Sequence, residues 1–381
     1  MQLVAYGAQD IYLTGNPQIT FFKVVYRRHT NFSMEAIQQT WNGTVAASGR
    51  VTATISRNGD LVSRCYLEST LNATNVVNGP ALDIDNVSCE IGGQLIDKHT
   101  GEWLEIWSEL SEPNPGGQGR GTKYQMMSGI GGALASNTGC ALTDGAAGTA
   151  SFFAAPDLTV DVVNTPLMFW FCRNPGLALP LIALQYHEVK IILEFSAALS
   201  GTGFDLWVDY IYLDTDERRR FAQVSHEYLI EQVQRQAEGT NTTFTLNFNH
   251  PVKELIWSGG WASGELTAFN SWATGDTWGL KLNGHDRFAN RDTRYFTRTQ
   301  VWQHHTGYGG FQNTTQAAGQ RLGVYSFALK PEEHQPSGTC NFSRIDNAQL
   351  TTSRTTPANI YAVNYNVLRI MSGMGGLAYS N

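Results

Sequence analysis

Histidines at three places in this chain have neighbours that could help to bind a metal ion. His226-Glu227 is followed by Tyr-Leu-Ile-Glu, so it lacks the second histidine of the HExxH zinc motif. His285-Asp286 and His304-His305 each supply two ligands, but neither pair has a third ligand at a suitable spacing. We therefore expect polar loop histidines rather than metal ligands, and the sequence predicts no cofactor.

Two carboxylates, Glu102 and Glu105, share one face of a short predicted helix. A glycoside hydrolase needs two carboxylates that flank the scissile bond, and two on one helix turn do not meet that requirement. The sequence contains neither a GxSxG motif nor a phosphate-binding loop. It therefore predicts no catalytic residue, and we expect a protein that is not an enzyme.

The stretch from Leu206 to Gln232 changes from apolar to charged residues halfway along. This change predicts a joint, that is, the place where two halves of the chain meet. Residues 206–213 are apolar or aromatic except Asp209, which is typical of a buried strand. The charged residues that follow cannot enter a core unpaired; they are Asp214, Asp216, Glu217, Arg218, Arg219 and Arg220. The Asp-x-Asp spacing resembles a nucleotide-sugar metal site, but the adjacent arginines favour ion pairing between two halves of the chain.

Length and composition support two β-rich domains. The 381 residues exceed the size at which one core usually stops growing. Charged residues make up only 15%, while 38 glycines and 11% aromatics favour strands and loops over helices. The net charge of −7 argues against direct contact with nucleic acid. The five cysteines are widely spaced and odd in number, so we expect reduced core thiols; they are Cys65, Cys89, Cys140, Cys172 and Cys340.

Alternating patterns and turn residues predict short strands in both halves. Asn58-Gly59 and Asn283-Gly284 each separate two apolar runs, the strongest short hairpin signal, and Gly92-Gly93 predicts another turn. We expect strands over residues 166–172 and 177–184, with Ile182 buried in the second, and a first strand of the second half from Phe221. Residues 113–148 predict a long excursion between strands.

One short helix interrupts the first half. Trp103, Leu104, Trp107 and Leu110 recur at three and four residues, which predicts an amphipathic helix over residues 102–110 whose tryptophans contact the core. The N-terminus has neither a basic region nor a long apolar run, so we expect synthesis in a cytosol-like compartment. The first residues lack a regular period and predict an arm.

Long stretches of the sequence resemble the major capsid protein of large icosahedral DNA viruses, especially of algal chloroviruses. They include QLVAYGAQDIYLTGNPQITFFKVVYRR, NPGLALPLIALQYHEVK, WVDYIYLDTDER, FNHPVKELIW, SGTCNFSRIDNA and YNVLRIMSGMGGLAYSN, and they cover nearly the whole chain. The resemblance implies an all-β fold, a double jelly roll of two tandem eight-stranded antiparallel sandwiches with short helices in loops. It divides the chain into an arm (residues 1–22), a first domain (23–214), a linker (215–220) and a second domain (221–381).

The resemblance also implies a function and partners. Homotrimers would form pseudo-hexagonal capsomers that tile an icosahedral virion shell around an internal membrane and a double-stranded DNA genome, assembled in the host cytoplasm. The arm would join neighbouring capsomers and minor capsid proteins. Its candidate assembly residues are Tyr6, Asp10, Phe21, Lys23, Arg27 and Arg28. From charge patterning alone, the basic cluster could contact anionic lipid or carboxylates, or form a solvated loop.

Covalent glycans are a further expectation from the resemblance. N-x-[ST] sequons begin at Asn31, Asn42, Asn72, Asn86, Asn241, Asn313 and Asn341. In chlorovirus-like relatives, viral enzymes modify asparagines outside this sequon, so the sequons do not identify the sites.

Residues 257–278 and 350–360 are short for the family, which implies a flatter outer surface. Alternative functions are a minor capsid or spike paralogue of the same fold, or a jelly-roll carbohydrate-binding protein.

Overall fold

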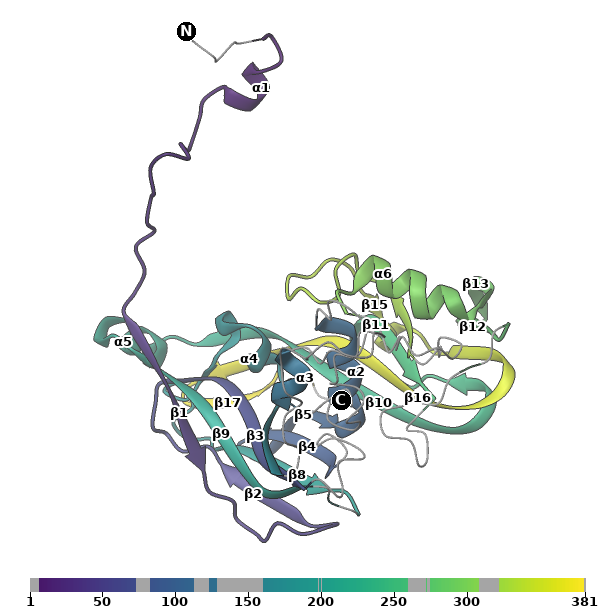
Figure 1. Ribbon diagram of the computed structural model, residues 1–381, viewed down its shortest axis with the longest axis horizontal. Helices are drawn as coiled ribbons and strands as arrows, with labels where there is room; N and C mark the ends of the chain where they lie inside the picture. Colours follow the sequence, from purple (N-terminus) through teal and green to yellow (C-terminus); the bar gives the residue numbers. More distant parts are fainter. Residues whose placement is uncertain are drawn as a thin grey trace, which may run out of the picture.

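Antiparallel strands dominate the architecture (Figure 1). The computed structural model describes residues 7–72, 83–112, 123–128, 160–197, 199, 201–259, 272, 275–307 and 322–379. Two β units lie side by side, and an N-terminal arm extends away from the first of them. Within these described ranges, no helix is both long and apolar enough to cross a membrane.

The first half of the chain folds into two sheets that exchange strands. One sheet has the order β1-β9-β3-β6, with β7 paired to β3, and the other has the order β2-β8-β4-β5. Consecutive strands such as β1 and β2, or β8 and β9, belong to opposite sheets, which is the jelly-roll pattern. The strands are β1 (Phe32–Gln39), β2 (Arg50–Thr54), β3 (Leu61–Asn72), β4 (Ile84–Ile91), β5 (Gln94–Thr100), β6 (Val160–Pro166), β7 (Leu179–Pro180), β8 (Val189–Phe195) and β9 (Gly201–Leu213).

The second half repeats this order within a single eight-stranded sheet. Two long strands, β10 and β16, pair along most of their lengths, with register shifts between Glu238 and Thr243. Residues 359–364 of β16 pair with β11, whereas residues 348–352 pair with β12. The strands are β10 (His226–Thr245), β11 (Pro251–Ser258), β12 (Thr277–Leu282), β13 (His285–Asp292), β14 (Leu322–Ser326), β15 (Cys340–Asn341), β16 (Ala348–Met371) and β17 (Met374–Leu377).

The register shifts divide the second sheet into two four-stranded layers. One layer has the order β10-β16-β11-β14 and the other the order β10-β16-β12-β13. These orders match β1-β9-β3-β6 and β2-β8-β4-β5 of the first half when each long strand is counted once in each layer. Because irregular pairing lets a strand bend, β10 and β16 pass from one layer to the other without a loop. The two halves therefore share one strand order, and the double jelly roll is confirmed.

Short helices connect and cover the strands. The predicted helix over residues 102–110 is confirmed as α2, and the Thr100 side chain caps it by accepting a hydrogen bond from the Trp103 amide at 3.1 Å. The helices are α1 (Ile11–Thr14), α2 (Gly101–Ser111), α3 (Lys123–Ser128), α4 (Trp170–Arg173), α5 (Thr215–Gln223) and α6 (Gln300–His304), with 3₁₀ turns η2 (Pro175–Leu177) and η4 (Phe342–Arg344) and a π-helical turn η3 (Tyr295–Thr299).

Two of the three predicted turns are hairpins. Asn283 and Gly284 join β12 to β13 with φ values of 51° and 78°, and Gly92 and Gly93 join β4 to β5 with 59° and 82°. Positive φ at both central residues matches the right-handed twist of the strands. Asn58-Gly59 is different because β2 and β3 lie in opposite sheets, so the chain crosses between layers there. The hairpin predicted at Asn58-Gly59 was wrong.

Other predicted elements also differ from the structure. Residues 170–173 form helix α4 instead of a strand, and residues 181–183 form a turn in which Ile182 is only half-buried. Pro180 has no amide hydrogen, so the extended segment β7 is limited to two residues. The expected linker and the expected strand start at Phe221 are both occupied by α5, and β10 begins at His226. The excursion over residues 113–148 and the segment 257–278 lie largely outside the described residues.

Candidate assembly surfaces and the joint between the halves

The N-terminal arm is exposed along its described length. The hydrogen bonds that its residues make, such as the Gly15 amide to the Ile11 carbonyl at 2.9 Å, stay within the arm. Phe21 is 90% exposed and Phe22 is 99% exposed. The arm continues to residue 31, beyond the predicted boundary at residue 22, because β1 begins only at Phe32. Apolar side chains that bury no surface against their own chain can bury it against a partner.

The candidate arm residues lie on this exposed segment. Asp10 precedes α1, and its carboxylate accepts the Gly7 amide at 2.7 Å. Lys23, Arg27 and Arg28 are exposed and lie among exposed apolar side chains. Tyr6 lies outside the described residues. An assembly role for these residues stays a prediction.

Arg218 of the joint forms an ion pair with a distant part of the first half. Arg218 lies 3.0 Å from the carboxylate of Asp60, which is almost fully buried next to β3. The second oxygen of Asp60 accepts the Leu213 amide at 2.9 Å, so this carboxylate fixes the end of β9 and the helix that follows. The other joint residues lie on α5 or at its start, mostly exposed; they are Asp214, Asp216, Glu217, Arg219 and Arg220.

Helix α2 belongs to the first half but packs against the second. Trp103 and Trp107 are buried in a cluster with Val233, Ile256 and Tyr361 of the second half. The ring centroid of Trp103 lies 5.6 Å from that of Trp107 and 5.3 Å from that of Tyr361. The predicted core role of these tryptophans is confirmed. Their contacts join the two halves through apolar surface removed from water.

Hydrogen bonds surround this apolar contact. The Glu102 carboxylate accepts hydrogen bonds from the Ser258 hydroxyl and, at 2.7 Å, from the Asn359 amide. The Asp97 carboxylate accepts the Val233 amide at 3.1 Å. Glu102, the first of the two carboxylates considered for catalysis, therefore holds the second half against α2. Buried polar groups that are paired across an interface fix its geometry.

A buried ionic cluster reinforces the joint. The Glu231 carboxylate on β10 lies 2.9 Å from Arg173 of α4, 2.9 Å from the fully buried Lys253 of β11 and 3.5 Å from His334. Burial alone would raise the pKa of Glu231, but a hydrogen bond from His334 and the charges of Lys253 and Arg173 outweigh it and lower the pKa to about 2. Glu231 is ionised at neutral pH and neutralises cations from both halves.

His305 occupies a second buried ionic site. Its Nε2 lies 3.0 Å from Glu254 and its Nδ1 lies 3.0 Å from Glu332. Burial alone would lower the pKa of His305, but the two carboxylates outweigh it and raise the pKa to about 9. The ring is therefore protonated and donates from both nitrogens. This role differs from the predicted loop histidine, because residues distant in sequence supply the carboxylates.

The C-terminal strand β17 returns to the first half. The Tyr186 amide donates to the Gly373 carbonyl at 3.0 Å, and His187 Nδ1 lies 2.9 Å from the Gly375 carbonyl oxygen. A β-carbon added at Gly373 would lie 2.6 Å from the Tyr186 ring, so only glycine allows this approach. Leu368 and Ile370 of β16 belong to the core of the first half.

The other residues considered from the sequence are possible metal ligands, cysteines and sequon asparagines. Across the described ranges, no group of three or more His, Cys, Asp or Glu side chains could hold a metal ion. The four cysteines that the structure describes are free, and Cys140 lies outside the described residues. Of the sequons, Asn31, Asn42, Asn241 and Asn341 are exposed, Asn86 is half-buried in β4, and Asn313 and the Asn72 side chain lie outside the described part.

Two family models match consecutive parts of the chain. The model described as "Major capsid protein N-terminus" matches residues 20–214, and the one described as "Large eukaryotic DNA virus major capsid protein" matches residues 217–376. The chain belongs to the major capsid protein family of large eukaryotic DNA viruses. It is a structural capsid protein of the virion, as the sequence resemblance predicted.

Individual relatives and solved structures agree with this membership. The chain is 52% identical to the major capsid protein of Pyramimonas orientalis virus and 41% identical to that of Paramecium bursaria Chlorella virus 1, each match covering 100% of this chain and 99% of the relative. A chain of the PBCV-1 virus capsid superposes with a TM-score of 0.74 at 36% identity, covering 95% of this chain and 100% of that chain. The Faustovirus major capsid protein shares the fold, with a TM-score of 0.62 at 13% identity.

Proposed function

We propose that this capsid protein assembles as a homotrimer whose six jelly-roll units form a pseudo-hexagonal capsomer. The observation that carries the proposal is the joint, in which α2, the Glu231 cluster and the β17 segment tie two units of the same strand order together. Two units held in one chain let threefold symmetry approximate sixfold packing. Capsomers of this shape tile the faces of an icosahedral shell through many contacts of modest strength.

The division of the chain follows from the same joint. We place the first domain at residues 32–214, after the arm, and the second at residues 224–381, with helix α5 between them. The arm, which includes Phe21 and Lys23, reaches neighbouring capsomers and minor capsid proteins, since its described apolar and basic side chains are exposed. The shell encloses an internal membrane, the protein has no catalytic activity, and assembly takes place in the host cytoplasm.

Glycans belong to the same proposal. Surface asparagines of loops carry sugars, as the family resemblance implies, whereas the half-buried Asn86 does not, because its amide donates to Glu194 at 3.2 Å. Peptide mass spectrometry of purified virions tests this point. Unmodified loop asparagines throughout would refute it.

The oligomeric state is the first test. Light scattering of the purified full chain is expected to give three times the 42.0 kDa mass of one chain. A stable monomer that does not assemble when concentrated would contradict the trimer. Removal of residues 1–22 is expected to leave the trimer folded and to impair shell formation. Complete shells from the truncated chain would refute the assembly role of the arm.

A further inference from the structure

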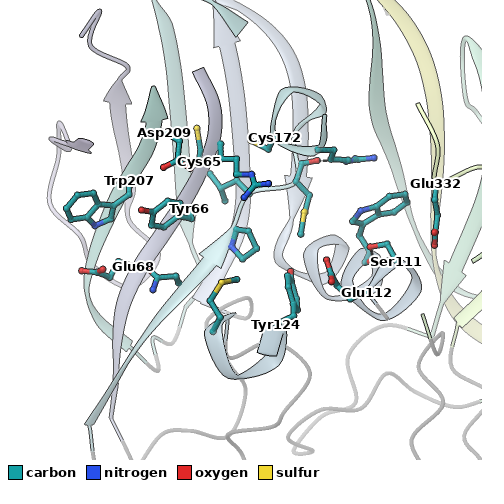
Figure 2. A pocket seen from close by; sticks show the side chains of 18 residues that line it. Cys65, Tyr66, Glu68, Ser111, Glu112, Tyr124, Cys172, Trp207, Asp209 and Glu332 are labelled. Atoms are coloured by element: carbon teal, nitrogen blue, oxygen red, sulfur yellow. Dashed lines mark hydrogen bonds between the residues drawn. The ribbon is translucent and has the colours of Figure 1, made fainter. Parts of the chain in front are cut away.

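One cavity, lined mainly by the first half, has lining residues to which the proposed function assigns no role. It has a volume of about 830 Å³ and lies between the outer face of the sheet and the end of α2 (Figure 2). Pockets of roughly 300–1,000 Å³ accommodate a ligand the size of a few side chains. Figure 2 shows Tyr66, Glu68 and Trp207 on the wall formed by the sheet, with Glu112 and Glu332 on the opposite wall.

The walls combine aromatic surface with an excess of carboxylates. Trp107, Tyr124 and Trp207 contribute rings, and four acidic residues line the space: Glu68, Glu112, Asp209 and Glu332. Two arginines also line it, fewer than the four acids: Arg64, whose charge partly offsets the rise that burial causes in the pKa of Asp209, and Arg173, which lies 2.9 Å from Glu231 and over the Trp107 ring. The lining is therefore acidic and aromatic, which favours a ligand with both cationic and apolar groups.

Two of these carboxylates, Glu112 and Glu332, lie on the same wall of the cavity (Figure 2). Burial and then the charge of Glu332 raise the pKa of Glu112. Glu332 is held by His305 and by the Thr306 amide, each at 3.0 Å, so it cannot turn away. A positive side chain placed beside Glu112 would relieve this repulsion.

A segment of the same sequence has the complementary chemistry. Residues 21–28, FFKVVYRR, alternate aromatic and aliphatic side chains with Lys23, Arg27 and Arg28, and they are exposed. The whole chain has a net charge of −7, so this cationic segment contrasts with an acidic body. β1 directs the arm away from its own body, which leaves the segment free to reach another copy (Figure 1).

We propose that the FFKVVYRR segment of one copy docks into the acidic aromatic cavity of a second copy. The aromatic side chains cover Tyr66 and Trp207, which are only half-buried, and an arginine takes the place beside Glu112. This inference rests on the proposed assembly and specifies which surface of a neighbour receives the arm. Contacts of this kind place a desolvated cation against carboxylates and give both affinity and register.

Photo-crosslinking tests the contact directly. The full chain is prepared with p-benzoylphenylalanine in place of Phe22, in isotopically light and heavy forms that are mixed before assembly. Mass spectrometry after irradiation is expected to find light-to-heavy links to peptides that contain Trp107, Glu112 or Trp207. Links confined to one copy, links to another surface, or no links would overturn the proposal.

Charge reversal provides a second test of the same contact. Glu112→Lys is expected to lower the yield of the light-to-heavy link by about tenfold, and a further R27E/R28E change is expected to restore it. The matched control is Glu188→Lys, an exposed acid far from the cavity residues in sequence, which leaves the yield unchanged. An unchanged yield in a folded Glu112→Lys chain would overturn the proposal.

The mass in solution separates this inference from the proposed function. Trimers without links to the cavity would refute the docking site and leave the capsomer intact. Monomers without links would refute both. If Glu112→Lys fails to fold, Glu112→Gln keeps the shape of the side chain, and a yield as high as that of the unaltered chain would count against the site.

Discussion

Arg173 of helix α4 lies 2.9 Å from Glu231 of strand β10, so this ion pair connects the two halves of the chain inside their interface. The same carboxylate neutralises Lys253, whose side chain is fully buried. Neither cation can turn toward water without disrupting its surroundings. Glu231 therefore contributes a buried negative charge to the joint, and its contribution to stability can be measured.

Replacing Glu231 with Gln is expected to destabilise the protein by about 3–5 kcal/mol, because Lys253 and Arg173 lose the charge that compensates their burial. Urea unfolding measures the change. Glu227→Gln is the matched control, since Glu227 lies four residues away on the same strand and pairs with Arg369 at 2.8 Å on the surface. We expect a loss of about 0–1 kcal/mol there. Equal losses in the two variants would contradict a special role for the buried cluster.

The stability of the protein is expected to fall as the pH rises through 9. The pKa of His305 is about 9 in the folded state and 6.5 as a free side chain, so the folded state holds an extra proton between these values. This contribution, about 3 kcal/mol, is fully present below pH 6.5 and is lost as the pH rises through 9. Denaturant unfolding at pH 6 and pH 10 measures it.

The control for this pH dependence is a pair of histidine variants. His305→Gln is expected to flatten the slope between pH 6.5 and 9. His304→Gln is expected to keep it, because His304 contacts the Leu329 carbonyl rather than a carboxylate. A slope that persists in His305→Gln would assign the proton to another group.

Trp103 is expected to be the most sensitive position of helix α2. Trp103→Ala removes a fully buried side chain that stacks on Trp107 and contacts the Tyr361 ring, and it should cost about 3–5 kcal/mol. Trp302 is 81% exposed, so Trp302→Ala should be nearly neutral. Thermal unfolding distinguishes the two. A small effect at Trp103 would mean that α2 does not join the halves.

A charge in the core of the first half is expected to prevent folding. Ile191 lies on β8, is fully buried and pairs with Ala53 and Cys89 on both sides, so Ile191→Asp would leave a carboxylate without a partner at a cost of several kcal/mol. Ile182 lies in a turn and is half-buried, so Ile182→Asp should still yield soluble protein. Soluble expression and melting temperature test both. Soluble Ile191→Asp of normal stability would refute the strand placement.

Much of the architecture could be predicted from local patterns. The spacing of Trp103, Leu104 and Trp107 repeats at the period of a helix, and α2 has those bounds within one residue. Asn283-Gly284 and Gly92-Gly93 supply the positive φ values that a two-residue hairpin requires. These features depend on neighbours in the sequence, so the sequence contains the information directly. The family resemblance added the double jelly roll, which no local pattern establishes.

The buried ionic contacts depend on residues far apart in the chain. Arg173 and Glu231 are separated by 58 positions, and the partners of His305 lie 51 and 27 positions away. Alone, each residue is an ordinary charged side chain. Asn58-Gly59 also could not be assigned from local sequence. A turn that crosses between sheets and a hairpin turn use similar residues, and they differ only in which strands pair.

By itself, the sequence determined the family, the two β-rich halves, helix α2 and the exposed arm, since all of these depend on near neighbours or on long matching stretches. The tertiary structure alone decided that α2 packs on the opposite half, that Glu231 and His305 are buried among partners of opposite charge, and that acidic and aromatic side chains gather in one cavity. The physical reason is that burial and electrostatic pairing are properties of the folded neighbourhood.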